Sequence, residues 1–485
     1  MPLILSGNVA SATAGGYEVA NSCIFDDGGS AYMYKTPGSV GDLQKWTYSV
    51  WFKRGNLGSE QYLLEYNEAA DHDDNFRVTI ASGDTIYIQD TEANTSNLDL
   101  RTNQVFRDCS AWYNLIIAVD TTQSTAANRC KVYLNGTQIT SWATETYPDQ
   151  NYNTNVNVAD EPLIIGRRES ISGSAISYFD GYMAEVVFID GTQYANTDFG
   201  EFDEDSPTIW KPKDVSGLTF GTNGFYLDFE ASGNLGNDAN GGTDLTESGL
   251  AATDQATDTP TNNFCTISPV AHQTTVQVLS EGNLQGTKSG SGGVNAATIA
   301  PTGGKWYAEF FVNTYGSNGI NAGVINVDSH ARWNVASTAL GDDEFSAGYY
   351  STGILYRNSE TNHTGNTNDD FDSYGADDII SIAMDLDNGF FYWAKNGTWQ
   401  NSGDPTSAGT GTGGVATSYV TANETYVYAA WIRNGSVISW NFGNPPTTFS
   451  ISSGNADANG YGNFEYAPPS GFYALCTKNL AEFGG

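Results

Sequence analysis

The stretch from residue 377 to residue 399, DDIISIAMDLDNGFFYWAKNGTW, limits the possible folds of this chain more than any other segment. Its first half alternates large apolar residues with small or polar ones, which is the period of a strand with one buried face. Asn388-Gly389 then supplies the two positive-φ positions of a tight type I′ turn. A two-residue turn at this point predicts a β-hairpin with Leu386 opposite Phe391 and Met384 opposite Trp393.

This register agrees with the hydrophobic pattern, because it places all four of those large side chains on one apolar face. Asp385 and Tyr392 share the opposite face, and Tyr392 is exposed if that face is solvated. A strand pair of this kind builds the core of a β-sandwich and contains no catalytic constellation. The segment therefore favours a binding or structural protein.

Composition excludes two classes of partner. The chain has 485 residues, enough for two or three domains, and its formal net charge is −36. A chain this acidic is repelled by nucleic acid and by anionic membrane surfaces. Among its residues, 54 Gly, 28 Tyr and 23 Phe are typical of an all-β protein with many tight turns.

Five cysteines are scattered along the chain without CxxC spacing, which indicates neither a disulfide framework nor a zinc site. We expect small buried thiols in a protein made in a reducing cytosol. The Asn135-Gly136 turn pairs Val132 with Ile139, which keeps Cys130 on the core face beside Val132. The cysteines are Cys23, Cys109, Cys130, Cys265 and Cys476.

The chain contains no segment suited to membrane insertion or signal-peptide secretion. No apolar run approaches the ~18 residues that span a bilayer. The N-terminal sequence MPLILSGNVASATAGGYEVA has no basic segment before its short apolar stretch. We therefore expect the protein to reach an extracellular site by another route, such as assembly into a particle that is released by lysis.

Four segments follow from the distribution of strands and turns. Residues 1–20 are rich in Gly, Ala and Ser and are predicted to form an attachment arm. Residues 21–230 and 273–480 carry short alternating strands and are predicted to form two antiparallel β-sandwiches. Residues 231–272, rich in Gly, Asn and Asp, are predicted to be a solvated connector between them. The predicted fold class is all-β.

The second sandwich resembles a SPRY domain, since four sequence blocks occur in the order of that family. The resemblance implies a bent β-sandwich that binds partners through loops at one end and is not an enzyme. An insertion at 359–373 stands where such domains carry variable loops, so the identity of the partner does not transfer. The blocks are GKWYAEFFV at 304–312, SAGYYSTGILYRN at 346–358, DDIISIAMDLDNGFFYWAKNG at 377–397 and YVYAAWIRNGSVISWNFG at 426–443.

The first sandwich resembles a laminin-G-like domain with a jelly roll of the concanavalin A type. The blocks WTYSVWFKRG, AWYNLIIAVD, CKVYLNGTQI and FDGYMAEVVFIDG appear in the expected order. Three later segments, at 199–214, 224–242 and 257–269, resemble segments that recur in virion proteins of tailed bacteriophages and prophages. In those proteins they follow a laminin-G-like domain, so the resemblance implies a bacteriophage virion protein.

The strongest candidate for catalysis is the acidic run Glu201-Phe202-Asp203-Glu204-Asp205. Glucanases of the concanavalin A type use an E-x-D-x-E strand that holds two carboxyl groups ~5 Å apart. Here the last member is Asp205, Pro207 follows closely, and the apolar alternation of a buried strand is missing. A solvated acidic loop accounts for this run better than a catalytic pair, and we expect no enzymatic activity.

A candidate calcium site lies in the sequence DHDDN, because laminin-G-like domains often bind calcium at a loop rim. Asp71, Asp73 and Asp74 could supply the oxygen ligands, although the spacing does not match an EF-hand loop. A solvated loop is the alternative interpretation. We expect no other cofactor.

Two loop sets combine aromatic rings with polar groups, as carbohydrate binding requires. The alternative is that many of these tyrosines pack in a core or an interface. The set in the first sandwich is Tyr147, Asp149, Asn151 and Tyr152, and the set in the second is Tyr349, Tyr350, Tyr356 and Arg357, beside His363, Asn366 and Asp370 of the insertion.

These observations predict a non-enzymatic virion protein, a tail fibre or related appendage subunit that displays lectin-like domains toward a host-surface glycan. A capsid decoration or head-fibre protein and a polysaccharide depolymerase are the alternatives. The expected partners are other virion proteins and a host-surface glycan or protein, without nucleic acid or membrane insertion. We expect a homo-oligomer, most simply a trimer, assembled in the host cytoplasm and exposed on the particle surface.

Overall fold

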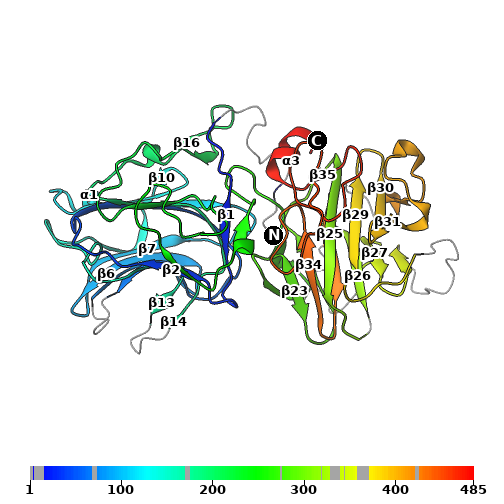
Figure 1. Ribbon diagram of the computed structural model, residues 1–485, viewed down its shortest axis with the longest axis horizontal. Helices are drawn as coiled ribbons and strands as arrows, with labels where there is room; N and C mark the ends of the chain where they lie inside the picture. Colours follow the sequence, from blue (N-terminus) through cyan, green and yellow to red (C-terminus); the bar gives the residue numbers. More distant parts are fainter. Residues whose placement is uncertain are drawn as a thin grey trace. The chain divides into compact units, whose positions relative to one another are not determined.

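The chain forms two compact units, Ala14–Thr261 and Asn262–Gly485, and Met1–Thr13 belongs to the latter unit. This computed structural model describes residues 4, 16–67, 74–169, 175–273, 276–317, 319–327, 339–342, 344–357, 371–420 and 425–484. We call Ala14–Thr261 the first unit and the remainder the second unit. Both are built from antiparallel β-sheets (Figure 1), as the sequence predicts.

The first unit is a sandwich of two eight-stranded sheets, which enclose one apolar core. Sheet A has the order β10 (Thr137–Gln138), β9 (Cys130–Leu134), β8 (Tyr113–Asp120), β3 (Lys45–Arg54), β15 (Gly181–Asp190), β1 (Ser22–Phe25) and β20 (Gln255–Ala256), with β18 (Phe225–Leu227) paired to β15. Sheet B has the order β11 (Trp142–Thr146), β7 (Thr95–Val105), β6 (Thr85–Glu92), β5 (Asn75–Ile80), β4 (Gln61–Asn67), β12 (Leu163–Ile165), β2 (Tyr32–Lys35) and β19 (Thr246–Ser248).

Two short hairpins accompany these sheets. They are β13 (Arg168–Glu169) with β14 (Ala175–Ile176), and β16 (Gly200–Phe202) with β17 (Trp210–Pro212). The β13–β14 hairpin lies against β4, since the guanidinium of Arg168 sits 5.7 Å from the centre of the Tyr62 ring. It therefore covers part of sheet B on the side away from the core.

The second unit is a sandwich of a six-stranded and a nine-stranded sheet around its own core. The first sheet has the order β21 (Ile267–His272), β24 (Gly293–Ala297), β33 (Tyr426–Ile432), β26 (Ile320–Asn326), β27 (Ser346–Tyr350) and β28 (Ile354–Arg357). The other has the order β22 (Val278–Ser280), β23 (Gln285–Lys288), β34 (Ser436–Asn441), β25 (Lys305–Thr314), β29 (Ile379–Asp385), β30 (Phe390–Lys395) and β31 (Thr398–Trp399), with β32 (Val415–Ala416) on β30 and β35 (Tyr473–Ala474) on β25.

Helices in the described residues are short. The α-helices are α1 (Ala126–Arg129) and α3 (Thr477–Phe483), and the 3₁₀ turns are η2 (Asn196–Asp198), η3 (Ala252–Asp254), η4 (Gln400–Ser402), η5 (Ala408–Thr410) and η6 (Thr417–Tyr419). None of these helices has the length and apolarity needed to cross a bilayer.

The Asn135-Gly136 hairpin has the predicted geometry. Asn135 has φ 45° and Gly136 has φ 75°, as a type I′ turn requires. The Ile139 amide donates to the Val132 carbonyl at 2.8 Å, which sets the predicted pairing. Cys130 is 2% exposed in the core, and all five cysteines are buried free thiols, so this prediction is confirmed.

The predicted register of the hairpin around Asn388 is wrong by two residues. Met384 pairs with Phe391, and Asp385 pairs with Phe390, so the connection contains four residues rather than two. The Asp385 carboxylate accepts hydrogen bonds from the backbone and side-chain amides of Asn388, at 2.9 and 2.8 Å, which holds the longer loop. Because the shift is even, Met384, Phe391 and Trp393 remain on the core face.

Both faces of this hairpin are buried. Tyr392 is 2% exposed and belongs to a second apolar cluster with Tyr307, Phe464 and Phe472. Residues near the C-terminus, including Phe464 and Phe472, pack over this side of the sheet. The hairpin face that carries Tyr392 is therefore covered by the protein and is not solvated.

The predicted connector, residues 231–272, is a folded part of the two units. Its β19 and β20 strands complete the edges of sheets B and A, and β21 belongs to the second unit. Asp258 is fully buried and pairs with the Lys53 ammonium at 2.8 Å. The polar composition of this segment predicts a solvated connector. The structure differs because the polar groups are satisfied inside the fold by ion pairs and backbone contacts.

The described part of the predicted N-terminal arm is also packed. Ile4 forms a parallel bridge with Ile299 in the second unit. In the first unit, the Tyr17 hydroxyl lies 2.8 Å from the Tyr226 hydroxyl. Residues 1–3 and 5–15 of the arm lie outside the described part of the chain.

Candidate functional site

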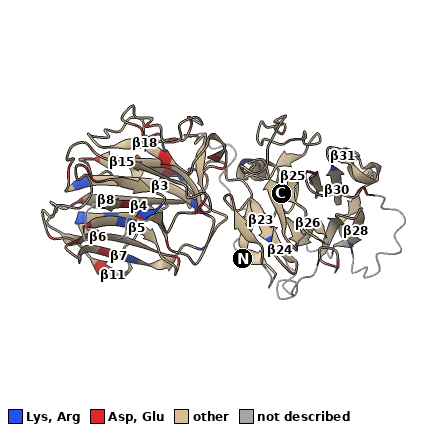
Figure 2. Cartoon of the chain, turned by 60° about the horizontal axis from the view of Figure 1, so that its bottom comes forward, with Lys and Arg blue, Asp and Glu red and all other residues tan. Residues whose placement is uncertain are grey.

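The outer face of sheet B carries a row of polar side chains on neighbouring strands. On β5 and β6, apolar residues alternate with Arg77, Tyr87 and Gln89, so the apolar ones enter the core and these three face outward. Figure 2 shows β4, β5, β6, β7 and β11 side by side with charged positions along them. We define the polar row as Glu65, Arg77, Tyr87, Gln89, Asp99 and Arg101.

Strand register brings these residues together across four strands. Glu65 of β4 is paired with Arg77, and Arg77 is paired with Gln89. Gln89 is paired in turn with Asp99 of β7, while Tyr87 is paired with Arg101. The row is thus set by the sheet and not by any single loop, which gives its side chains a rigid base.

Hydrogen bonds hold the charged groups of the row in fixed orientations. Arg77 Nε donates to Gln89 Oε1 at 2.9 Å. Arg101 donates to both carboxylate oxygens of Asp99, at 2.8 and 2.9 Å, and its guanidinium stacks 4.7 Å from the centre of the Tyr87 ring. The Arg101 side chain is 37% exposed, so donors of this pair remain accessible to a ligand.

Glu65 lies at the covered end of the row. It is 3% exposed, and its Oε2 accepts a hydrogen bond from the Glu169 amide at 2.8 Å. Burial raises the pKa of Glu65 to about 7, against the opposing effects of that hydrogen bond and of Arg168. The same β13–β14 region places Arg167 4.2 Å from the centre of the Tyr32 ring, so aromatic and cationic groups continue beside the row.

The loop set predicted in the first sandwich is engaged within the fold. Tyr152 donates its hydroxyl to Asp90 at 2.8 Å and accepts from Asn97 at 3.1 Å. Tyr147 packs partly against the core and donates to Glu145 at 3.1 Å, while Asp149 is exposed. Tyr152 therefore ties its loop to buried Asp90, and its hydroxyl is occupied.

The set predicted in the second sandwich is divided between the two faces of one sheet. Tyr349 is fully buried in the core. Tyr350 and Tyr356 stack on each other on the opposite face, with ring centres 4.9 Å apart and planes 7° apart, and Arg357 is half-buried at the end of β28. The predicted residues His363, Asn366 and Asp370 lie outside the described residues.

The acidic run at 201–205 forms part of a short hairpin. Glu201 is 46% exposed on its side chain and lies within 3.9 Å of Lys211 and Lys213. Asp203 is buried and accepts from the amides of Asp205 and Ser206 at 3.1 and 2.8 Å. These contacts make Asp203 the cap of the turn between β16 and β17.

Of the predicted calcium ligands, Asp71 and Asp73 lie outside the described residues, and Asp74 accepts from the Ala93 amide at 2.6 Å. A different acidic group forms where β1 ends and β15 begins. Carboxylate oxygens of Asp26, Asp27 and Asp180 lie within 4.8 Å of one another.

Strand pairing explains this acidic corner. Phe25 pairs with Gly181, so the next residues along the two antiparallel strands, Asp26 and Asp180, meet beyond the end of the pair. The amide of Asn56 donates to both Asp27 and Asp180. Burial, and then the charge of Asp26, raises the pKa of Asp27. Carboxylate oxygens in this arrangement are the ligand type that Ca²⁺ takes.

Sequence reasoning missed the polar row and the acidic corner for different reasons. A signal for the row is present in the alternating segments NFRVTI and TIYIQ, at 75–80 and 85–89. Joining those segments into one face requires the strand order of sheet B, which a single sequence does not contain. The acidic corner joins residues about 150 positions apart and has no local spacing to detect.

Several solved structures show weak similarity to parts of this chain. Similar solved structures include the SPRY domain of human HERC1, at 16% identity over 38% of this chain and 99% of that chain, with a TM-score of 0.27. A putative carbohydrate binding protein from Bacteroides ovatus matches at 16% identity over 48% of this chain and 58% of that chain, with a TM-score of 0.33. A heptameric SAP-like pentraxin from Limulus polyphemus matches at 12% identity over 33% and 75%, with a TM-score of 0.23.

A search of curated proteins found no match to this chain. Residues 27–195, which lie within the first unit, match the family model described as the concanavalin A-like lectin/glucanases superfamily.

Proposed function

We propose that this protein is a carbohydrate-binding protein whose glycan site is the polar row on sheet B. The observation that carries the proposal is the row itself, in which two carboxylates, an amide, two guanidinium groups and a tyrosine occupy adjacent strands. Sugar hydroxyls both donate and accept hydrogen bonds, so they are matched by planar groups of this kind. The lectin/glucanase family match over 27–195 supports the proposal, because it covers the strands that form the row.

We propose further that the protein binds glycan without cleaving it. Glu65 on β4 and Asp99 on β7 are separated by three strand spacings, ~14 Å at ~4.8 Å per spacing. Glycosidases hold their two carboxyl groups ~5–9.5 Å apart. Release of oligosaccharide from capsule or lipopolysaccharide by the purified protein, lost in Glu65→Gln or Glu201→Gln, would establish the depolymerase alternative instead.

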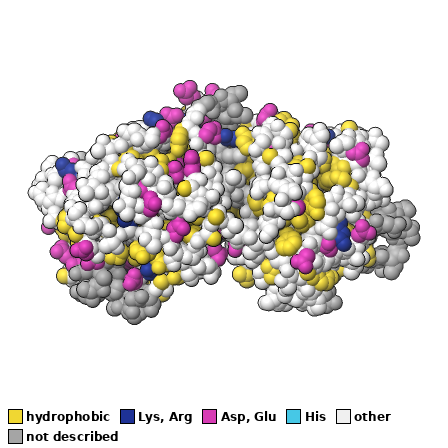
Figure 3. Space-filling view, viewed as in Figure 1, with side chains coloured by type: hydrophobic (Ala, Val, Ile, Leu, Met, Phe, Trp, Pro, Cys, Tyr) yellow, Lys and Arg dark blue, Asp and Glu magenta, His cyan; other side chains and the backbone are white. Residues whose placement is uncertain are grey.

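The biological setting that we propose is a bacteriophage virion, with the chain as a tail fibre or related appendage subunit. The resemblance of 199–214, 224–242 and 257–269 to segments of phage virion proteins supports this setting. Acidic side chains spread over the face drawn in Figure 3, together with the net charge of −36, are suited to a protein whose target is neither nucleic acid nor an anionic membrane.

Immunogold labelling of intact particles tests the virion assignment. Label on the tail supports the appendage subunit, and label on the head supports a decoration or head-fibre protein. Protein confined to the infected cytoplasm would exclude both. We also propose association into a trimer, which gives weak glycan sites avidity, and light scattering that shows a stable monomer would exclude it.

The glycan proposal is tested with the full-length protein on an array of bacterial surface glycans. We expect binding to a subset of saccharides and loss of that binding in Arg77→Ala and Arg101→Ala. Arg107→Ala is the matched control, because Arg107 is 59% exposed and pairs with Asp84 away from the row. Equal binding by all three variants would place the site elsewhere.

A further inference from the structure

The outer face of sheet B is covered over two of its middle strands, β4 and β12. Tyr62 and Glu65 of β4 are 1% and 3% exposed. Ile164 of β12, which is paired with Glu65 and faces outward beside it, is 1% exposed. By contrast, Arg77 of β5 and Arg101 of β7 are half-buried and reach the solvent. The accessible part of the polar row therefore ends between β5 and β4.

The two residues of β13 form the cover over β4. The Arg168 guanidinium lies over the Tyr62 ring, and the Glu169 amide donates to the Glu65 carboxylate at 2.8 Å. Arg168 Nη1 also lies 4.0 Å from Oε1 of Glu60, the residue that precedes β4. These contacts fix β13 on the outer face of the sheet, where it stands across the line of the polar row.

Three charged side chains border the accessible strands at this point, and we call Glu60, Arg168 and Glu169 the end wall. Their side chains are 45%, 28% and 27% exposed, so a ligand on the row can contact them. Tyr62, which lies under Arg168, is paired with Thr79 of β5. The end wall is thus one strand spacing, ~4.8 Å, from the first accessible strand.

The opposite end of the row is open. There the row reaches β11, an edge strand of sheet B. Its Thr144 and Thr146, which are paired with Arg101 and Asp99, carry only small side chains. From β4 to β11 the face covers four strand spacings, ~19 Å, which is longer than one sugar ring. The row is therefore an elongated surface that is closed at the end wall and open at the sheet edge.

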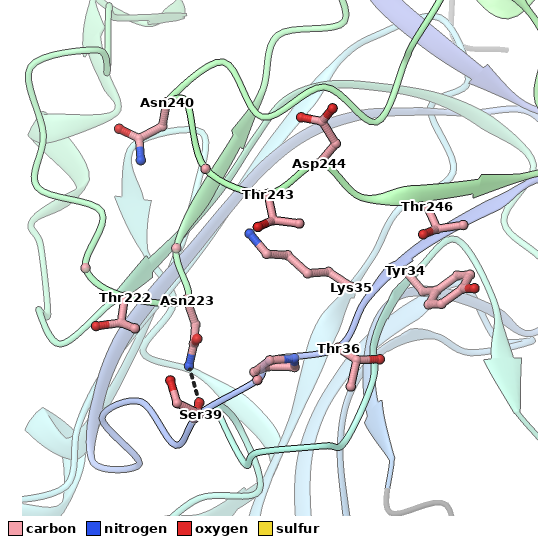
Figure 4. Close-up of a pocket in the computed structure, with 15 residues that line it drawn as sticks. Tyr34, Lys35, Thr36, Ser39, Thr222, Asn223, Asn240, Thr243, Asp244 and Thr246 are labelled. Atoms are coloured by element: carbon pink, nitrogen blue, oxygen red, sulfur yellow. Dashed lines mark hydrogen bonds between the residues drawn. The ribbon is translucent and has the colours of Figure 1, made fainter.

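The covered strands also separate the row from the largest hollow of the first unit. Tyr34 and Thr246 lie together at one side of a cavity of about 450 Å³ beside β2 and β19 (Figure 4). In the strand order of sheet B, β4 and β12 stand between this cavity and the accessible strands of the row. A ligand that lies on the row and stops at the end wall does not reach the cavity.

We propose that the polar row recognises the end of a glycan chain, with the terminal sugar against the end wall and the rest of the chain leaving over β11. This inference rests on the proposed function and specifies which part of the glycan is bound.

The carboxylates of the end wall favour a terminal sugar. A terminal sugar carries a hydroxyl group where an internal sugar carries a glycosidic oxygen. The hydroxyl can donate a hydrogen bond, whereas the glycosidic oxygen can only accept one. Ionised Glu60 and Glu169 can only accept, so they match the terminal hydroxyl and repel the oxygen of an internal linkage. Arg168 supplies a donor beside them for the same hydroxyl.

Calorimetric titration of the full-length protein with one polysaccharide at several chain lengths tests the inference. The probe is the linear bacterial polysaccharide that binds most strongly on the glycan array, shortened by partial acid hydrolysis and separated by length. We expect one bound protomer per chain at every length, because each linear chain has one matching end. A number of bound protomers that grows with chain length would overturn the inference, since internal sugars would then be recognised.

Variants of the end wall locate the terminal sugar. Glu60→Ala and Glu169→Ala should each weaken binding by about tenfold or more, because a hydrogen bond to a charged group is lost. Glu204→Ala is the matched control, since it removes an exposed carboxylate from the turn between β16 and β17, outside sheet B. Thr243→Trp fills the cavity from an exposed position and should bind as the unmodified protein does.

Unchanged affinity in Glu60→Ala and Glu169→Ala, with melting temperatures that show folded protein, would overturn the assignment of the end wall. Loss of binding in folded Thr243→Trp would do the same, because the chain end would then lie in the cavity.

Arg77→Ala separates a failure of this inference from a failure of the proposed function. If the number of bound protomers grows with chain length and Arg77→Ala abolishes binding, the row binds internal sugars, so the proposed function stands and the inference fails. If no polysaccharide binds, or if Arg77→Ala binds as the unmodified protein does, the proposed function fails and the inference fails with it.

Discussion

Single aromatic residues hold the hairpin of the second unit from both sides. Trp393 is 1% exposed, packs in the main core, and donates from its indole nitrogen to the Ala322 carbonyl at 3.1 Å. Tyr392, on the other face, is 2% exposed beneath the C-terminal segments. Neighbouring residues on one strand thus belong to two separate apolar clusters.

Replacing either residue should destabilise the second unit to a similar extent. We expect Trp393→Ala and Tyr392→Ala each to lower the free energy of unfolding by about 3–5 kcal/mol, as for large aromatic residues removed from cores. Urea denaturation followed by tryptophan fluorescence measures this, with Thr398→Ala at an exposed position of β31 as control. A near-neutral Tyr392→Ala would show that its face is solvated after all.

Buried carboxyl groups make stability depend on pH. Burial raises the pKa of Glu309 to about 7, although the amides of Tyr466 and Glu465 donate to it and oppose the shift. An acid whose pKa is higher in the folded state binds more protons there, so its stabilisation is present at low pH and is lost as pH rises. Burial raises the pKa of Glu65 and Asp90 to about 7 and of Glu185 to about 8 in the same way.

The melting temperature should therefore decrease as the pH rises from about 5 to about 8. This range is bounded by the usual carboxyl pKa and these raised values. Glu309→Gln should flatten the part of this fall that belongs to the second unit, because glutamine cannot ionise. Calorimetry at a series of pH values measures it. A stability that rises across this range would contradict the raised pKa values.

At the scale of elements, local turn chemistry was enough to predict one hairpin and not the other. Asn135-Gly136 has a register that follows from the turn alone. Around Asn388, the Asp385 side chain and a hydrogen bond from the Leu386 amide to the Gly304 carbonyl stabilise a longer loop. The second case depends on a residue about 80 positions away, and a sequence pattern does not contain that contact.

The same limit explains the segment 231–261. Its few apolar residues predict a connector, yet Leu235 and Leu245 are buried and β19 and β20 close two sheet edges. Asp258 lies under the Trp112 indole, which donates to it at 3.1 Å. Pairing with distant partners, rather than local hydrophobicity, makes this segment part of the first unit.

The buried ion pair of this segment gives an element-scale prediction. Lys53→Met leaves the Asp258 carboxylate buried without its cation, so we expect a loss of roughly 3–5 kcal/mol in the stability of the first unit. Lys213→Met, at a 42% exposed lysine, is the control and should change little. Chemical denaturation followed by circular dichroism measures both, and equal effects would show that 231–261 is not integral to the unit.

At the scale of the whole molecule, the sequence predicted the all-β class and two sandwiches, because alternation and turn residues are local signals. The proposed site could not be predicted in the same way. Glu65 and Asp99 are 34 positions apart in sequence, and the strand order β4-β5-β6-β7 is what aligns them in one row. Two of the tyrosines named from the sequence have structural contacts, since Tyr349 is buried in the core and Tyr152 donates to Asp90.

We propose that the polar row binds glycan. Isothermal titration of the full-length protein with an oligosaccharide selected on the array tests it most directly. We expect Arg77→Ala and Arg101→Ala each to weaken binding by about tenfold or more, which corresponds to ~1.4 kcal/mol, whereas Arg107→Ala should bind as the unmodified protein does. Unchanged affinity in both row variants, with the same melting temperature, would contradict it.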